Sequence, residues 1–247
     1  MTGPTAPRRI AMWSGPRNIS TAMMRAWGAR PDTTVCDEPL YAHYLSVTGH
    51  PHPGAAEVMA HHDTDWRRVV DTLLGPAPDG RAIWYQKHMA HHLLPGMPVE
   101  WIDGLTNVFL VRSPREMLVS LTKVLPIVTV EETGLPRQVE LFERERQRTG
   151  ITPPVLDARD VLTDPAGMLR RLCERIEIPW SDAMLSWPAG PRATDGIWAK
   201  HWYANVERST GFAPWTPPRG DPPDALTSLL NACLPLYDHL HAHRLTA

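Results

Sequence analysis

The sequence lacks several features that would point to particular classes of protein. It has three cysteines among 247 residues, Cys36, Cys173 and Cys233, which are scattered and odd in number. This pattern fits a reduced, cytoplasmic protein better than a disulfide framework or a zinc site. No apolar run is long enough to span a membrane, and the N-terminus has no signal-peptide pattern. We therefore expect a cytoplasmic protein that does not act at a membrane.

A large excess of charge of one sign is also missing. The net charge is -2, and charged residues make up 21% of the chain. No global basic field is present to attract nucleic acid, so any anion-binding site must be built locally. Proline and tryptophan, by contrast, are abundant at 26 and 10 residues. They indicate rigid connections and large aromatic surfaces that are buried or line a pocket.

Apolar runs that suit strands alternate along the chain with segments of helical pattern. Strands are expected at 9–13, 33–41, 81–88, 106–112 and 154–158. Helices are expected at 20–29, 55–74, 113–125, 135–149, 164–178 and 223–243. Strand–turn–helix units in series predict an α/β fold, with a mainly parallel sheet flanked by helices on both faces.

One domain is expected over residues 1–247. Residues 1–7 are predicted to be a flexible tail, and 189–247 an irregular cap, rich in tryptophan and proline, that ends in the C-terminal helix. In parallel sheets of this kind, ligands bind outside the carboxyl ends of the strands. This rule puts four parts of the chain at one edge of the sheet: residues 14–20, Glu38, His88 and Arg112.

The turn between the first strand and the first helix has the layout of a phosphate-binding loop. Counted from Gly15, the Walker pattern needs a second glycine and then a lysine where Ser20 and Thr21 stand. Backbone N–H groups at the helix start, the two hydroxyls and the guanidinium of Arg17 remain as anion ligands. The alternative is an ordinary capped helix with an exposed arginine. The predicted nucleotide-binding residues are Ser14, Gly15, Pro16, Arg17, Asn18, Ile19, Ser20 and Thr21.

A second anion-binding pair follows the fourth strand. Arg112 ends that strand, and Ser120 lies eight residues later on the next helix, so both can hold a phosphate at the same edge. This pattern, R-x-P-x-x-x-x-x-S with Pro114, resembles that of the sulfotransferases that use 3'-phosphoadenosine 5'-phosphosulfate (PAPS). Residues 155–180 resemble the same family, with an acidic strand, Asp-Pro and a helix containing leucine and cysteine. The resemblance covers residues 8–188.

This resemblance implies a three-layer P-loop NTPase-like fold and PAPS as the cofactor. In the family, the first loop binds the 5'-phosphosulfate, and the positions matched by Arg112 and Ser120 bind the 3'-phosphate. Arg17 stands where the family usually has a lysine that acts on the bridging oxygen and the departing phosphate. Ala22 stands where the family often has a tryptophan that packs on the adenine, so the adenine must be held from elsewhere.

Two residues are candidates for the base that takes the acceptor's proton. His88 follows Lys87 and is similar to the histidine of the Lys-Thr-His-like turn in cytosolic sulfotransferases, although the lysine is one position off. Glu38 resembles the glutamate that some bacterial and Golgi-type members use, and its alternative role is that of a turn residue before proline. His88 is favoured over Glu38. His91 and His92 are expected on the surface of a short helix, and a zinc site made with His88 is disfavoured because no cysteine accompanies them.

The C-terminal part supplies further candidates. In the family, a late basic loop closes over the 3'-phosphate, and Arg208 or Arg219 can play that role here. The alternative is a flap that only packs on the core. Trp198, Trp202 and Tyr203 can form the pocket wall against an apolar or aromatic acceptor.

The leading hypothesis is an enzyme that transfers a sulfuryl group from PAPS to a hydroxyl, or an amine, of a small-molecule acceptor. No metal, nucleic acid or membrane is expected to take part. One alternative is a P-loop kinase or NTPase, against which stand the missing Gly-Lys pair and the lack of a clear acid for magnesium, apart from Asp37. The other alternative is a non-catalytic nucleotide-binding protein with the same fold.

Overall fold

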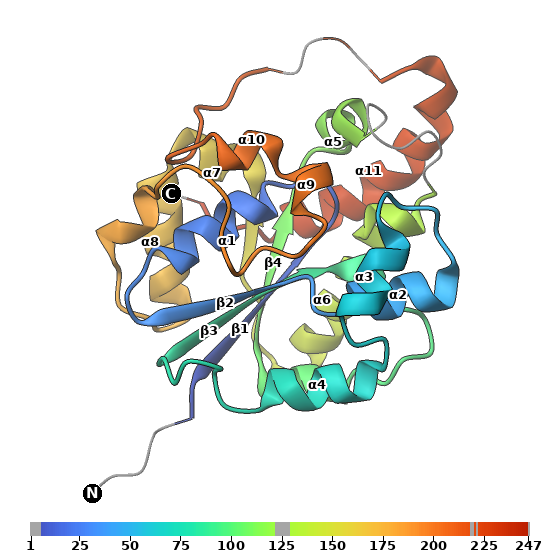
Figure 1. Ribbon diagram of the computed structural model, residues 1–247. Helices are drawn as coiled ribbons and strands as arrows, with labels where there is room; N and C mark the ends of the chain where they lie inside the picture. Colours follow the sequence, from blue (N-terminus) through green and yellow to red (C-terminus); the bar gives the residue numbers. More distant parts are fainter. Residues whose placement is uncertain (1–5, 122–128, 218–219, 221, 247) are drawn as a thin grey trace, which may run out of the picture.

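The structure, a computed structural model, describes residues 6–121, 129–217, 220 and 222–246. Its centre is a five-stranded sheet in the order β2-β3-β1-β4-β5, in which all neighbouring strands are parallel (Figure 1). The strands are β1 (Arg8–Ser14), β2 (Thr33–Asp37), β3 (Ile83–Met89), β4 (Thr106–Val111) and β5 (Val155–Asp157). This confirms the predicted α/β class with a parallel sheet.

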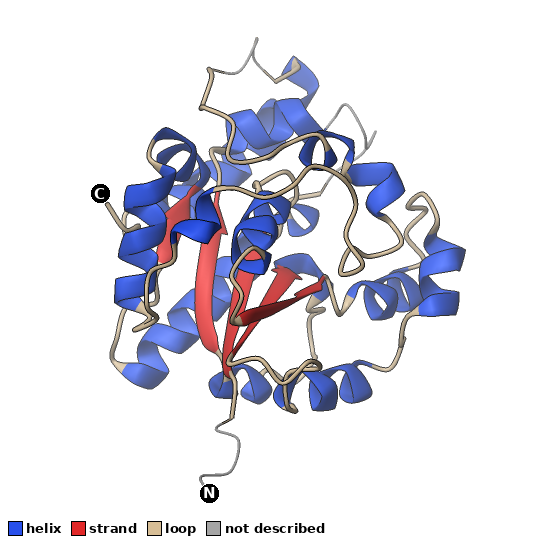
Figure 2. Cartoon of the chain, turned by 60° about the vertical axis from the view of Figure 1, so that its left-hand side comes forward, coloured by secondary structure: helices blue, strands red, loops and turns tan. Residues whose placement is uncertain are grey.

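Helices cover both faces of this sheet, which gives the predicted three layers (Figure 2). Alternation along β1 sends Ile10 and Met12 to one face and Ala11 and Trp13 to the other. The first face packs against α1 (Ser20–Gly28), α7 (Ala158–Thr163) and α8 (Pro165–Arg175). The second packs against α4 (Trp66–Leu74), α6 (Leu135–Thr149) and α11 (Thr227–His241). The strands are therefore buried on both sides, which explains their near-continuous apolar runs.

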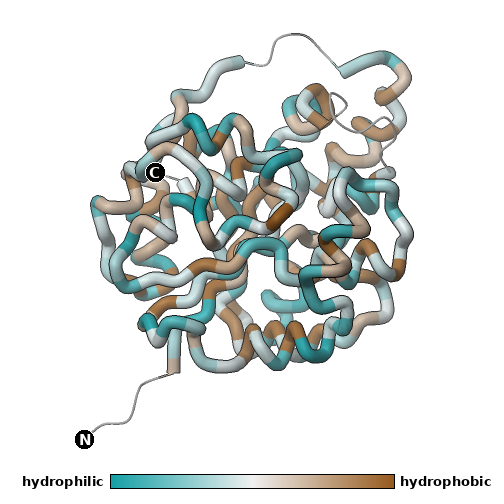
Figure 3. The backbone as a smooth tube through the Cα atoms, viewed as in Figure 1, coloured by the Kyte–Doolittle hydropathy of each residue, from teal (hydrophilic) through white to brown (hydrophobic). Residues whose placement is uncertain are grey.

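The hydropathy of the chain follows this layering. Hydrophobic stretches run along the central strands, and α4 alternates hydrophobic and hydrophilic residues (Figure 3). In α4 the buried side chains are Val69, Val70 and Leu73, the inward stripe of an amphipathic helix. In the described part of the chain, every helix is too short or too polar to cross a membrane.

Some element boundaries differ from those expected. The helix expected at 55–74 is two helices, α3 (Ala55–His61) and α4, because Asp65 caps α4 by accepting a hydrogen bond from the N–H of Arg67 at 3.0 Å. The helix expected at 113–125 is α5 (Pro114–Leu121); residues 122–125 lie outside the described residues, as does most of the tail predicted at 1–7.

A helix that the sequence did not reveal, α2 (Tyr41–Thr48), follows β2. The strand expected within 33–41, with its end at Asp37-Glu38-Pro39, ends at Asp37, because Glu38 takes a φ of 42° and Pro39 has no N–H to donate. A positive φ at a residue other than glycine is unusual and costs about 1–3 kcal/mol. The turn at Glu38 brings α2 back beside the sheet edge at which β2 ends.

The C-terminal segment crosses over α1 and the strand ends, with α9 (Ala199–Trp202) and α10 (Ala204–Glu207) on top (Figure 1). Asp195 anchors this segment by accepting two hydrogen bonds from Arg25 of α1, at 2.5 and 2.7 Å. Both side chains are less than 5% exposed, at 3% and 4%. The N–H of Gly196 donates to Asp37 Oδ2 at 3.0 Å, which ties the segment to the end of β2.

Arg25→Met is expected to lower the free energy of unfolding by about 3–5 kcal/mol, because it leaves the Asp195 carboxylate buried without its partner. Urea denaturation monitored by tryptophan fluorescence measures the change. Arg68→Met is the matched control, since Arg68 makes a similar two-bond pair with Asp63 on the surface. Equal losses of stability in the two variants would contradict a structural role for the buried pair.

Candidate active site

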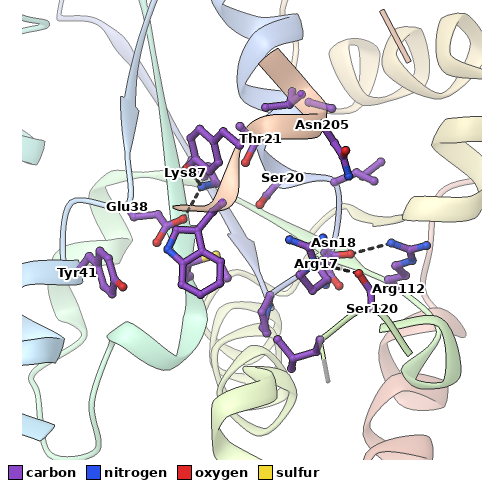
Figure 4. A pocket seen from close by; sticks show the side chains of 18 of the residues that line it. Arg17, Asn18, Ser20, Thr21, Glu38, Tyr41, Lys87, Arg112, Ser120 and Asn205 are labelled. Atoms are coloured by element: carbon purple, nitrogen blue, oxygen red, sulfur yellow. Dashed lines mark hydrogen bonds and ion pairs between the residues drawn. The ribbon is translucent and has the colours of Figure 1, made fainter. Parts of the chain in front are cut away.

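A cavity of about 370 Å³ opens at the carboxyl ends of the strands, where a parallel sheet binds its ligands (Figure 4). The loop after β1 lines it from Pro16 to Ala22. Glu38 lies in its wall just after β2, Lys87 near the end of β3, and Arg112 just after β4. The structure therefore brings Glu38, Arg112 and most of the predicted loop to one place.

The loop between β1 and α1 has an unusual backbone. Arg17 and Ile19 have φ values of 62° and 58°, conformations found in nests whose successive N–H groups converge on an anion. None of the described side chains caps the N-terminus of α1, so its first N–H groups face the loop. Gly15 is required because a Cβ there would lie 2.2 Å from the carbonyl oxygen of Thr133. The loop is thus held tightly with N–H donors at the cavity.

Two predicted loop residues lie behind the cavity wall and do not line it. Ser14 is fully buried, and its hydroxyl donates to the carbonyl of His88 at 3.3 Å. Gly15 is the close-packed position described above. Asn18 lines the cavity and also donates to the carbonyl of Leu110 at 3.1 Å, which fixes the loop to the end of β4.

Arg17, Arg112 and Ser120 form a cluster on one side of the cavity (Figure 4). Arg17 Nε donates to Ser120 Oγ at 2.9 Å, and Arg112 Nη1 donates to the carbonyl of Arg17 at 2.9 Å. Arg112 Nε is oriented by Glu116, at 3.0 Å. Burial and then the positive charge of Arg112 lower the pKa of Arg17. An anion placed between the two guanidinium groups would relieve this repulsion.

On the other side of the cavity, Glu38 belongs to a buried network around Lys87. Lys87 Nζ donates to Asp37 Oδ1 at 2.8 Å, to Glu38 Oε1 at 2.5 Å and to the hydroxyl of Tyr203 at 2.6 Å. Burial would lower the pKa of Lys87, but the two carboxylates outweigh it and raise that pKa well above its usual value. Burial raises the pKa of Glu38, with Lys87 acting in the opposite direction. Lys87 is thus a fixed cation that holds the Glu38 carboxylate at the cavity.

The structure corrects the expected position of His88. It lies within β3, is 1% exposed, and does not line the cavity. Its ring stacks on Trp13 with centroids 4.4 Å apart, and Nε2 lies 3.2 Å from Gln86 Oε1. Burial lowers its pKa to about 3. Successive strand residues face opposite sides of a sheet, so Lys87 points to the cavity and His88 to the opposite core.

His91 and His92 lie on a short helix (Ala90–His92), as expected, but neither is exposed on the surface. Both line the cavity, and the ring of His92 stacks between Tyr41 and Tyr44, with centroids 4.8 and 4.7 Å away. The Nδ1 atoms of both histidines are buried and have no hydrogen-bond partner among the described residues. Burial lowers the pKa of His91 to about 3 and that of His92 well below its usual value. Across the described residues, no three His, Cys, Asp or Glu side chains are grouped to hold a metal ion.

Of the C-terminal candidates, some line the cavity and others do not. Trp202 and Tyr203 line the cavity, but Trp198 is buried and does not. Arg208 is exposed and lies outside the cavity lining; it donates to Asn205 Oδ1 at 2.8 Å, and Asn205 does line it. Arg219 lies outside the described residues.

Sequence reasoning missed Lys87 as a site residue and missed the aromatic wall made by Tyr41 and Tyr44. One feature could have indicated Lys87: it pairs with Asp37 in the β2–β3 register. A lysine beside an acidic residue at the ends of two neighbouring strands suggests an ion pair at the edge of the sheet where ligands bind. The tyrosines had none, because the helix that carries them was not predicted.

A sulfotransferase domain family model matches residues 8–244. Two Arabidopsis thaliana proteins, branched-chain-amino-acid aminotransferase-like proteins 1 and 2, are 38% and 36% identical over 96% and 95% of this chain. The chain spans only 42% and 41% of their lengths.

Two solved structures share the fold. The sulfotransferase domain of the Synechococcus PCC 7002 olefin synthase is 16% identical, with a TM-score of 0.58, and the match covers 99% of this chain and 98% of that one. A sulfotransferase from Alicyclobacillus acidocaldarius is 15% identical, with a TM-score of 0.55 and 98% of each chain covered. The expected family is confirmed: this chain belongs to the sulfotransferase domain family.

Proposed function

We propose that this enzyme transfers the sulfuryl group of PAPS to the hydroxyl, or the amine, of a small-molecule acceptor. One observation carries the choice of donor. The loop at Pro16–Thr21 and the pair Arg112 and Ser120 lie side by side on one cavity, linked by the 2.9 Å bond from Arg17 to Ser120, and we infer a phosphate position at each. A nucleotide with phosphates at both the 5' and 3' positions would occupy both positions. ATP carries phosphates only at its 5' position and would occupy only the one at the loop.

The residues present fit this donor. The N–H groups of the loop and Arg17 would hold the 5'-phosphosulfate, and Arg112 and Ser120 the 3'-phosphate. The adenine would occupy the apolar part of the cavity lined by Ala22, Leu162, Val206 and Phe212. The small Ala22 leaves space there, and Phe212 offers an aromatic ring for the base.

PAPS supplies an activated sulfuryl group: its S–O bond to phosphate breaks as the acceptor oxygen bonds to sulfur, and the electron pair stays on the phosphate. Arg17 and the loop N–H groups stabilise the charge that develops on that phosphate. Glu38 accepts the acceptor's proton, and the burial that raises its pKa makes it a better base than an exposed carboxylate. Lys87 keeps the carboxylate in place through the 2.5 Å contact.

Calorimetry with the product nucleotide, 3',5'-bisphosphoadenosine (PAP), tests the donor. PAP is expected to bind more tightly than AMP, ADP or ATP, and without added metal, because only PAP fills both phosphate sites. Equal affinities of PAP and AMP would contradict the two-site assignment. Tighter binding of ATP that depends on magnesium would favour a kinase or NTPase instead.

Arg112→Ala separates the two sites in the same experiment. A charge-assisted contact contributes about 1.5–3 kcal/mol, so PAP affinity is expected to fall about tenfold or more while AMP affinity stays close to wild type. Arg115→Ala is the control, since this neighbouring arginine on α5 does not line the cavity.

A further inference from the structure

The part of the cavity away from Arg17 and Arg112 has a distinct chemistry, and we call it the acceptor half. It is lined by Glu38, Tyr41, Tyr44, His92, Glu132 and Trp202. In Figure 4, Glu38 and Tyr41 lie on the side opposite to Arg112 and Ser120. The whole cavity, about 370 Å³, is near the lower end of the range for small-molecule sites. A nucleotide in the remainder leaves space only for a small acceptor.

Among the described residues, this half has no cation free to bind an anionic acceptor. Lys87 lines the cavity beside Glu38, but its three N–H donors are all used, by Asp37, Glu38 and Tyr203. The three imidazoles that line the cavity do not add charge, because burial lowers the pKa of His52, His91 and His92. An acceptor with a carboxylate or phosphate would therefore be desolvated here without a counter-ion, which is costly.

Negative charge is present instead. The two negative charges of Asp37 and Glu38 exceed the single positive charge of Lys87. Glu132 adds a further carboxylate, whose side chain is 16% exposed. The negative charge of Glu132 also acts on Tyr44 in the cavity wall: burial and then Glu132 raise the pKa of Tyr44 to about 12. The Glu132 oxygens lie 2.8 Å from His50 Nε2 and 2.6 Å from the N–H of Thr129, so this carboxylate is fixed in position.

Two polar groups of this half, the Glu38 carboxylate and the His92 ring, are placed to bind one hydroxyl. A neutral imidazole carries one N–H and one lone pair, and the buried Nδ1 of His92 has no partner in the described chain. That atom lies 4.0 Å from Glu38 Oε2, so the oxygen of one hydroxyl fits at about 2.8 Å from each; it accepts a hydrogen bond from Nδ1–H and donates its own proton to Glu38. Trp202 adds an aromatic ring at the same site, and such rings attract cations.

Given the sulfuryl transfer proposed above, we propose that the acceptor is a small amino alcohol. Its hydroxyl lies between Glu38 and His92, and its protonated amine lies in the field of Glu132, near Trp202. The reaction then transfers the sulfuryl group to the hydroxyl oxygen, whose proton passes to Glu38.

A set of probes that differ in the charged or neutral group at one end tests this assignment. The probes are 3-aminopropan-1-ol, butan-1-ol and 4-hydroxybutanoate, which share the hydroxyl and the three-carbon chain. Their dissociation constants are measured by ligand-observed NMR with PAP saturating the donor sites. The amino alcohol is expected to bind about tenfold more tightly than butan-1-ol, and 4-hydroxybutanoate more weakly than either. Equal binding of the first two, or tightest binding of the anion, would overturn the proposal.

The bound PAP is itself an anion, so the contribution of the protein is isolated with Glu132→Gln, in which PAP is unchanged. The preference for the amino alcohol should shrink in this variant and persist in Glu174→Gln, whose carboxylate is exposed on α8. An undiminished preference in Glu132→Gln would overturn the placement of the amine. If PAP itself fails to bind, the donor proposal fails; if PAP binds without any charge preference, only the acceptor assignment fails.

Discussion

Glu38→Gln is expected to lower turnover by about 10²–10⁴-fold while the affinity for PAP stays close to wild type. The amide keeps the shape of the carboxylate and can still accept the hydrogen bond from Lys87, but it cannot take a proton. Glu38 is part of the cavity wall and is held at 2.5 Å by Lys87. Turnover is measured as transfer of radiolabelled sulfate from PAPS to a panel of amino alcohols, phenols and amines.

The pH dependence gives an independent check. Burial raises the pKa of Glu38, so the ionised, proton-accepting form is present above that raised pKa and is lost as the pH falls through it. Turnover of the wild type should decrease along this acidic limb. The residual turnover of Glu38→Gln should lack the limb, since the glutamine does not titrate.

His88→Gln is the control for the assignment of the base. His88 stacks on Trp13 on the opposite side of β3, so its replacement should reduce stability but leave turnover close to wild type. If His88→Gln loses turnover while Glu38→Gln retains it, then Glu38 is not the base and the side-chain directions along β3 must differ from those described here.

The architecture was predictable because its signals are local. Continuous apolar runs marked the buried strands, and small or hydroxyl residues marked the loop after β1. The pair Arg112 and Ser120 was found for the same reason: a fixed spacing places a strand end and the next helix side by side. In each case the residues that make the feature belong to one element or to two consecutive elements of the chain.

The parts of the site that sequence reasoning placed wrongly depend on side-chain direction or on distant contacts. Lys87 and His88 are neighbours, and a difference of one position in the strand decides which of them faces the cavity. The hydroxyl of Tyr203 meets Asp37 at 2.7 Å across 166 positions of sequence, and no local pattern predicts such a pairing. Glu38 could be named as a candidate, but its proposed role as the base depends on this network.

Arg17→Ala is expected to lower turnover by about 10²–10³-fold, as the removal of one preorganised donor to a developing negative charge does. Arg17 is held by Ser120 at 2.9 Å and lies in the loop where the 5'-phosphosulfate is proposed to bind. The charge on the departing phosphate is larger in the transition state than in the bound donor, so the effect should fall mainly on kcat and less on the KM for PAPS.

Two comparisons separate this role from a general loss of positive charge. Arg112→Ala removes an equal charge from the same cluster but should act mainly on the KM, because the 3'-phosphate does not change charge during the reaction. Arg17→Lys should recover much of the lost turnover, since the related enzymes that the loop resembles usually carry a lysine at this position. Similar kcat losses in Arg17→Ala and Arg112→Ala, with no recovery in Arg17→Lys, would show that Arg17 supports the loop and does not act on the departing phosphate.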